Sequence, residues 1–321
     1  MENTKIKLAC YWACGCGGCD VSILDTNLKV LDLAQAADIV FWPIAVDFKE
    51  ADVEALPDGS IDLCLFNGSI RNEENLKMAL LLRKKSKVLV AFGTCAYIGG
   101  IHGLINTTTT ARVMETVFAG VPSVDNPDRT VPLARTAMPE GDLELPRLFD
   151  TVRPLDQVVA VDYYVPGCPP AASRVGEVID AYLSGAMPAR GAVLGASEKA
   201  LCDACPRQSS GKTVREFTRP HLVRADDTIC FLEQGIICLG PVTRAGCGEL
   251  CVRGNMPCSG CYGPTPETYD PGAAMIGVLA SLIEGRTSED AKRAAGSVAD
   301  PLGNLYRFTM AASLLKKVRG R

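Results

Sequence analysis

The chain contains 321 residues, enough for about two domains at roughly 150 residues each. Lys and Arg number 33 against 37 Asp and Glu, and 47% of the residues are hydrophobic, which excludes a basic nucleic-acid-binding surface and a disordered acidic chain. Fifteen cysteines accompany only two histidines, so thiolate is the one abundant soft metal ligand.

Strand and helix patterns alternate in the first part of the chain. Five apolar runs rich in β-branched or aromatic residues are expected strands: 6–12, 39–46, 61–67, 87–92 and 157–165. Helical patterns cover 21–36, 73–85 and 171–185. Alternation implies parallel pairing, and continuous apolar runs imply a sheet covered on both faces, so residues 1–187 are expected to form a doubly wound α/β domain.

Two segments depart from this pattern. Residues 106–154 carry six prolines and few strand signals, which indicates an insertion. From residue 188 to the end at 321 a second region is expected, because residues 189–266 hold eight cysteines and many Gly and Pro residues but almost no periodic apolar segment. Such a stretch cannot build an ordinary core, so bound metal is expected to hold it together.

Export and membrane signals are lacking. The N-terminal residues have no long apolar segment and no paired arginines, so the protein is expected in the cytoplasm. No run approaches the roughly 18 apolar residues of a membrane span. Disulfides are disfavoured in a reducing cytosol, and an odd number of cysteines cannot all pair. Metal clusters or redox thiols are therefore the default expectation.

Four cysteines of the first domain follow the ends of expected strands. They are Cys16 and Cys19 in GCGGC, Cys95 in GTC and Cys168 in PGCPP. Ligands of an open parallel sheet bind outside the carboxyl ends of its strands, so these distant residues are expected to converge on one site. Adjacent glycines would let the backbone approach that site closely. Buried, inert thiols are the alternative for this set.

Eight further cysteines make up two complete quartets in the second region: Cys202, Cys205, Cys230, Cys238, Cys247, Cys251, Cys258 and Cys261. Structural zinc sites are the alternative here, with a usual signature of two close pairs about 15 to 20 residues apart. Cys230 and Cys238 are too widely spaced for that signature. Cys205 and Cys258 border proline, as ferredoxin ligands often do, which favours iron-sulfur clusters.

The motifs GCGGC, GTC and PGCPP, followed in order by CxxC, GIICLGP and PCSGC, resemble those of the small subunits of nickel-iron hydrogenases. The similarity covers nearly the whole chain and points to the cytosolic methyl-viologen-reducing branch, which does not reduce coenzyme F420 and works with heterodisulfide reductase. The resemblance implies a flavodoxin-like first domain and three 4Fe-4S clusters that carry electrons. It assigns a proximal cluster to Cys16, Cys19, Cys95 and Cys168, a medial cluster to Cys247, Cys251, Cys258 and Cys261, and a distal cluster to Cys202, Cys205, Cys230 and Cys238.

The same resemblance implies partners and no active site on this chain. Hydrogen would react at a nickel-iron large subunit, and a small iron-sulfur delta-type subunit, the heterodisulfide reductase flavoprotein or a ferredoxin would accept electrons. Periplasmic members have a histidine where this chain has Cys202, and a three-iron medial cluster where Cys251 here offers a fourth ligand. Both departures favour all-cysteine clusters of low potential.

Three cysteines and both histidines lie outside these sets. Cys10 and Cys64 fall within expected strands and are expected to be buried as small hydrophobes. Cys14 lies two residues before Cys16, so it is expected either to lie beside the proximal ligands or to compete with Cys16 as a ligand; the CxxC spacing of the family motif favours Cys16. His102 and His221 are expected to be structural, because the quartets are complete without them.

Two other functions remain open at this level. A complex-I-like quinone-reducing subunit would share the fold and the proximal cluster, but such subunits normally have adjacent cysteines and lack the eight-cysteine region. A hydrogenase-like oxidoreductase whose partner has lost nickel would use the same electron path for another donor. No residue of this chain distinguishes this nickel-free oxidoreductase from a hydrogenase.

Overall fold

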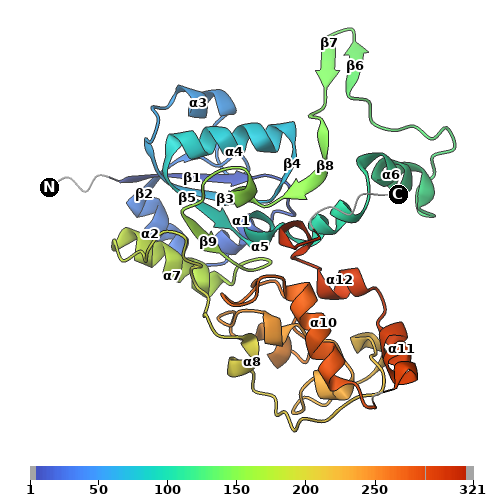
Figure 1. The fold of residues 1–321 in the computed structure, drawn as a ribbon. Coiled ribbons are helices and arrows are strands. Elements are labelled where there is room, and N and C mark those ends of the chain that lie inside the picture. The colour runs from blue at the N-terminus through green and yellow to red at the C-terminus, as the bar shows by residue number, and fades with distance from the viewer. Residues whose placement is uncertain (1–4, 286, 316–321) are drawn as a thin grey trace.

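The computed structural model describes residues 5–285 and 287–315, and Figure 1 shows an α/β domain with a helix- and loop-rich region packed beside it. Five parallel strands form the main sheet, in the order β2-β1-β3-β5-β9. Their bounds are β1 Ile6–Trp12, β2 Ala37–Phe41, β3 Ile61–Asn67, β5 Ser86–Phe92 and β9 Tyr163–Val165. This is the flavodoxin-like order, with its switch point between β1 and β3.

Helices cover both faces of the sheet, as expected for a doubly wound domain. One layer contains α1 (Gly18–Leu24), α2 (Lys29–Ala36) and α7 (Ala172–Leu183), and the other contains α3 (Glu50–Ala55), α4 (Glu73–Lys85) and α5 (Thr94–Ile98). Leu65 and Val90 are buried against the first layer, whereas Phe66 and Leu89 are buried against the second. Since successive side chains of a strand alternate in direction, covering both faces requires the continuous apolar runs of the sequence.

Three expected elements were wrong in extent. The helix expected at 21–36 is two helices, α1 and α2, because the connection places Asn27 in the left-handed region at φ 57°. The strand expected at 39–46 ends at Phe41. Pro43 lies two residues further on and has no backbone N–H to donate to a neighbouring strand. Of the strand expected at 157–165 only Tyr163–Val165 forms, after a short 3-10 turn at Leu155–Gln157.

The expected insertion lies outside the main sheet and has its own structure. A 3-10 helix, Ile101–Thr107, leads to α6 (Thr110–Glu115) and a π-helical turn, Thr116–Gly120. The strands β6 (Arg135–Met138) and β7 (Gly141–Glu144) form an antiparallel hairpin. The chain returns through β8 (Leu148–Arg153), which pairs antiparallel with β4 (Ile70–Asn72).

The second region has a hydrophobic core, so the expectation that it lacks one was wrong. Its helices are α8 (Leu201–Ala204), α9 (Leu250–Arg253), α10 (Pro271–Leu282), α11 (Ser288–Ser297) and α12 (Pro301–Leu305), with 3-10 turns at Pro220–Leu222, Leu232–Gln234, Gly240–Val242 and Met310–Ala312. Phe231 and Ile236 from the cysteine-rich stretch are buried together with Met275 of α10. The core was missed because its contributions from that stretch are single residues without a period.

Hydrogen bonds join the α/β domain to the rest of the chain at more than one place. Beyond residue 187, Leu194 still donates its N–H to the Tyr164 carbonyl at 2.7 Å and is buried with the sheet core. Near the C-terminus, the Gln157 side chain donates to the Ala311 carbonyl at 3.1 Å. The division of the chain into 1–187 and 188–321 stays a prediction. None of the helices in the described part of the chain is long and apolar enough to cross a bilayer.

Candidate functional site

The fold brings together the four cysteines of the first domain. Cys16 lies in the loop after β1, Cys19 in α1, Cys95 in α5 after β5, and Cys168 directly after β9. Burial raises the pKa of the Cys19 thiol, and repulsion from Cys95, Cys168 and Cys16 raises it further. Burial and the neighbouring Cys168 and Cys16 likewise raise the pKa of Cys95 to about 12. The predicted convergence at the carboxyl ends of the strands is therefore present in the structure.

Two glycines make room for these thiols. Gly93, at φ 87°, precedes α5, and a methyl group in its place would collide with the sulfur of Cys19. Gly100, at φ 71°, follows the same helix, and a methyl group there would lie 2.5 Å from the sulfur of Cys95. Both the left-handed backbone and the close approach of sulfur require glycine at these positions.

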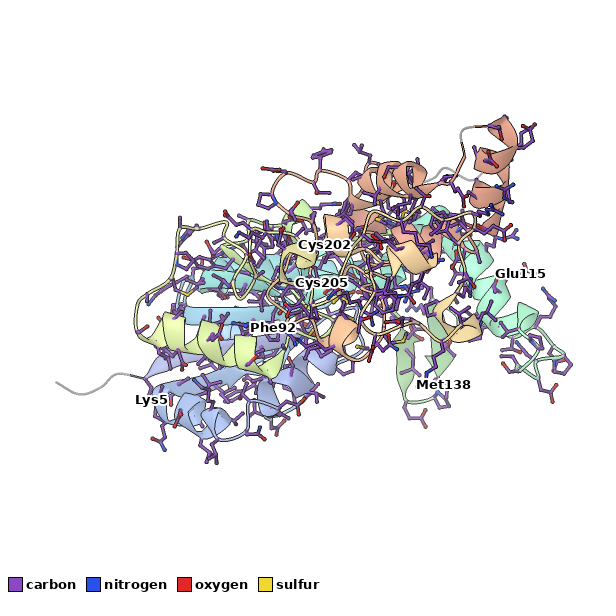
Figure 2. All side chains as sticks on the ribbon, turned by 90° about the horizontal axis from the view of Figure 1, so that it is seen from below. Lys5, Phe92, Glu115, Met138, Cys202 and Cys205 are labelled. Carbon is purple, nitrogen blue, oxygen red and sulfur yellow. The ribbon has the colours of Figure 1, made fainter. Side chains whose placement is uncertain are left out.

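A second group of thiols lies in the loop-rich region. Cys202 lies in α8 and Cys205 is the C-cap of that helix; both are labelled in Figure 2. Burial raises the pKa of Cys202 to about 12, with further contributions from Cys238, Cys230 and Cys205. A methyl group at Gly240 would lie 3.1 Å from the Cys202 sulfur and 3.6 Å from that of Cys238. The four cysteines expected to form the distal set are thus neighbours.

The third group lies between the other two. Burial raises the pKa of Cys261 to about 12, and Cys251 and Cys247 raise it further. A cavity of about 340 Å³ is lined by the four cysteines of the expected medial set, which are Cys247, Cys251, Cys258 and Cys261. Cys168 of the first group lines the same cavity. The structure therefore brings this set together around an open space.

Contacts link the three groups in one order. On one side, Cys168 and Cys261 line the same cavity, and Cys168 is close enough to affect the pKa of Cys261, so the first group adjoins the third. On the other side, the Cys258 N–H donates to the sulfur of Cys238 at 3.3 Å, which joins the third group to the second. The segment that contains Cys258 and Cys261 therefore contacts both neighbouring groups.

The surroundings of the thiols are compatible with a cluster of several metal ions. The Cys258 N–H donates to the Cys238 sulfur at 3.3 Å, and the backbone groups of Gly240 and Gly260 act to lower the pKa values of Cys238 and Cys258. Such hydrogen bonds to ligand sulfur tune cluster potentials. Within residues 5–285 and 287–315, no three His, Cys, Asp or Glu side chains are close enough to hold a single metal ion. A tetrahedral zinc site would need its sulfurs about 2.3 Å from one point.

The remaining cysteines lie outside the three groups. Cys10 and Cys64 are buried on opposite faces of the sheet, which confirms their expected role as small hydrophobes, and burial raises the pKa of Cys64 to about 12. Cys14 hydrogen-bonds to Ser69, and burial raises the pKa of its thiol. Cys14 is also close enough to Cys95 to raise its pKa, so this thiol lies beside the first group.

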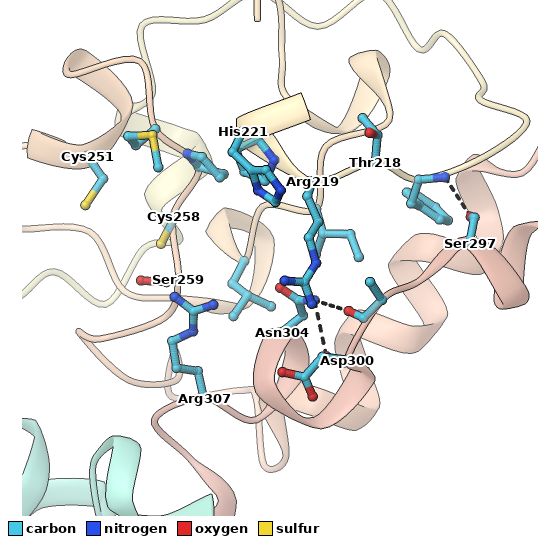
Figure 3. A pocket seen from close by; sticks show the side chains of 17 residues that line it. Thr218, Arg219, His221, Cys251, Cys258, Ser259, Ser297, Asp300, Asn304 and Arg307 are labelled. Carbon is cyan, nitrogen blue, oxygen red and sulfur yellow. Dashed lines mark hydrogen bonds between the residues drawn. The ribbon is translucent and has the colours of Figure 1, made fainter. Parts of the chain in front are cut away.

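The two histidines differ in their surroundings, and only His221 shares a pocket with cysteines of the third group. His102 is hydrogen-bonded through Nε2 to the Ser69 hydroxyl at 2.6 Å, and burial lowers its pKa. His221 is exposed and lines an open pocket of about 490 Å³. Figure 3 shows His221 in that pocket near Arg219, with Cys251 and Cys258 at one side.

Sequence reasoning missed Thr94 and the pocket of Figure 3. The Thr94 hydroxyl donates to the Cys261 carbonyl at 2.6 Å and accepts from the Gly167 N–H at 3.2 Å. Thr94 therefore holds the loops of Cys168 and Cys261 in place between the first and third groups. Its position next to Cys95 in GTC was the only available signal.

Comparison with known proteins identifies the class. Residues 16–182 match the family of the NADH ubiquinone oxidoreductase 20 kDa subunit. The fold resembles a chain of the NiFeSe hydrogenase from Desulfovibrio vulgaris Hildenborough, with a TM-score of 0.51 and 18% identity over 82% of this chain and 95% of that chain. The chain is thus an oxidoreductase subunit with the fold of hydrogenase small subunits.

Full-length relatives identify the family. An iron-sulfur subunit of the F420-non-reducing hydrogenase of Archaeoglobus profundus is 40% identical over 97% of this chain and 98% of the relative. A subunit of the F420-non-reducing hydrogenase vhu of Methanocaldococcus jannaschii is 36% identical over 99% of both chains. The chain belongs to this family of hydrogenase small subunits, whose role is electron transfer.

Proposed function

We propose that this chain passes electrons from a nickel-iron large subunit through three 4Fe-4S clusters to a separate acceptor. The observation that carries the proposal is the order of the thiol groups, because the segment of Cys258 and Cys261 contacts both Cys238 and Cys168. A linear series of groups is what a path for electrons requires. When bound, the clusters supply one-electron carriers whose potentials depend on hydrogen bonds and burial.

The residues of the chain prepare this path by burial and by thiol chemistry. Burial raises the pKa of most of the thiols, so without metal they keep their protons at neutral pH. Iron binds thiolate, so loading the sites releases protons.

The large subunit is proposed to cover the thiols of the first domain. Cys16 and Cys168 are exposed. Beside them, Trp12 lies against Gly15 and Gly17 of the GCGGC loop and is itself 40% exposed. Ile44 and Phe48 line the same cavity as Trp12, with exposures of 52% and 38%. An obligate interface here is expected to exceed about 2,000 Å².

The acceptor is proposed to dock near the second group of thiols. Cys202 is exposed, so the distal end of the path reaches the surface without another subunit. A heterodisulfide-reductase flavoprotein, with a small delta-type iron-sulfur subunit between them, or a ferredoxin-type protein is the proposed acceptor. The low potential expected from four cysteine ligands suits such partners.

A nickel-free oxidoreductase is the second candidate. The family match over residues 16–182 favours it, because that family is named for a quinone-reducing enzyme and includes the proximal thiols. Anaerobic copurification of this chain with its large subunit distinguishes the two. About one nickel per complex and about twelve irons on this chain would support the hydrogenase, whereas full iron without nickel would support the second candidate.

A further inference from the structure

The insertion carries an arm, defined here as residues 121–147, that is not part of any described core. Figure 1 shows its β6–β7 hairpin projecting away from the sheet and from the second region. Every residue from 127 to 148 is exposed. The base of the arm is nonetheless fixed, because Arg147 donates to Glu73 at 2.8 Å and Asn106 hydrogen-bonds to both backbone groups of Val152.

The hairpin has one polar and one apolar face. Arg135 pairs across the strands with Glu144, and it forms an ion pair with Asp142 on the same face. Because side chains alternate along a strand, the opposite face carries Ala134, Thr136, Met138, Leu143 and Leu145. Met138, Leu143 and Leu145 are 46%, 62% and 57% exposed.

This apolar face needs a partner. An antiparallel sheet with one polar and one apolar face normally packs the apolar face on a core. A two-stranded hairpin alone is only marginally stable in water. None of the arm's apolar residues belongs to the hydrophobic clusters of the described chain. Among residues 5–285 and 287–315 no hydrophobic cluster covers this face, which leaves it open to another chain.

The position of the base indicates which chain. β4 pairs with β8 and begins three residues after β3 ends. It therefore lies at the carboxyl ends of the parallel strands, where the first group of thiols also lies. Ser69, just before β4, donates its N–H to the Cys14 carbonyl at 2.8 Å, so the base of the arm is tied to the loop that leads to Cys16. A subunit that covers those thiols therefore lies next to the base of the arm.

We propose that the apolar face of the arm packs against the large subunit and clamps it over the proximal thiols. This inference rests on the proposed function, which supplies the large subunit. On the opposite, polar face, Arg135 and Asp142 pair with each other and are exposed to water. The arm thus adds a second, separate contact to the interface around Trp12.

A matched pair of variants tests the arm in the full chain. The variant Leu143→Ser with Leu145→Ser changes the apolar face, and the control Ala137→Ser with Glu144→Ser places two serines on the opposite face of the same hairpin. Both should keep their iron content. We expect the first to bind the purified large subunit at least about tenfold more weakly, from the lost burial of two leucines, and the control to bind within about twofold of the unchanged protein.

A photo-reactive residue at position 143 identifies the occupant. Crosslinks to the large subunit support the proposal, whereas crosslinks to a second copy of this chain overturn it. If the unchanged chain binds the large subunit and both variants bind equally well, the arm is not a clamp while the proposed function stands. If the unchanged chain does not bind the large subunit at all, the proposed function fails together with this inference.

Discussion

Gly93→Ala should remove the proximal cluster while leaving the other two. Gly93 adopts φ 87°, and a methyl group there would collide with the sulfur of Cys19. The backbone strain of alanine in this region costs about 1–3 kcal/mol. Displacement of the Cys19 sulfur is an additional effect, and because Gly93 is also the N-cap of α5, which carries Cys95, the change disturbs two of the four thiolates. We expect iron to fall from about twelve to about eight per chain.

The matched control is Gly59→Ala. Gly59 has φ 65°, and a methyl group there would meet nothing within 4 Å, so only the backbone strain is added. It should cost about 1–2 kcal/mol and leave about twelve irons. Anaerobic iron and acid-labile sulfide analysis, with EPR of the reduced chain, measures both variants. If Gly93→Ala retained full iron and unchanged spectra, Cys19 would not be a ligand held by this close packing.

Further predictions concern single residues. Cys251→Ser should convert the medial cluster to a three-iron form visible by EPR after oxidation, while hydrogen uptake with a high-potential dye continues; an unchanged spectrum would remove Cys251 from the ligand set. Cys10→Ala and Cys64→Ala should each destabilise the fold by roughly 1–2 kcal/mol in urea unfolding and leave the iron content unchanged, because both thiols are buried in the sheet core. Hydrogen bonds from Ser209, Ser210 and Gly211 lower the pKa of Glu233 to about 2, so its stabilisation is present above the unfolded pKa near 4.5 and is lost as the pH falls toward 2. Glu233→Gln should therefore reduce the loss of stability over that acidic range, as measured by urea midpoints; an unchanged pH dependence would show that Glu233 does not contribute it.

The sequence indicated the sheet and the thiol groups because both follow from strong local signals. Apolar runs define the strands, and Cys95 and Cys168 follow strand ends. Because the carboxyl ends of parallel strands lie at one side of the sheet, their closeness could be predicted. The break at Asn27 could not be predicted, because a single left-handed residue leaves the helical pattern on either side intact.

Other features depend on contacts that sequence spacing does not record. Thr94 bonds to Cys261 across 167 positions of sequence and to Gly167 across 73. The apolar face of the arm was missed because each strand of the hairpin has four residues, too few for alternation to be recognised among prolines. In both cases the missing information is which distant segment lies opposite.

The proposed electron path is tested by the reduction of this chain's clusters by hydrogen, followed by EPR in the complex with the large subunit and in the isolated chain. We predict that hydrogen reduces three 4Fe-4S clusters in the complex. We predict no reduction in the isolated chain, although dithionite should still reduce the same clusters there. Reduction of the isolated chain by hydrogen, or a complex in which hydrogen reduces no cluster of this chain, would contradict its role as the electron path of a hydrogenase.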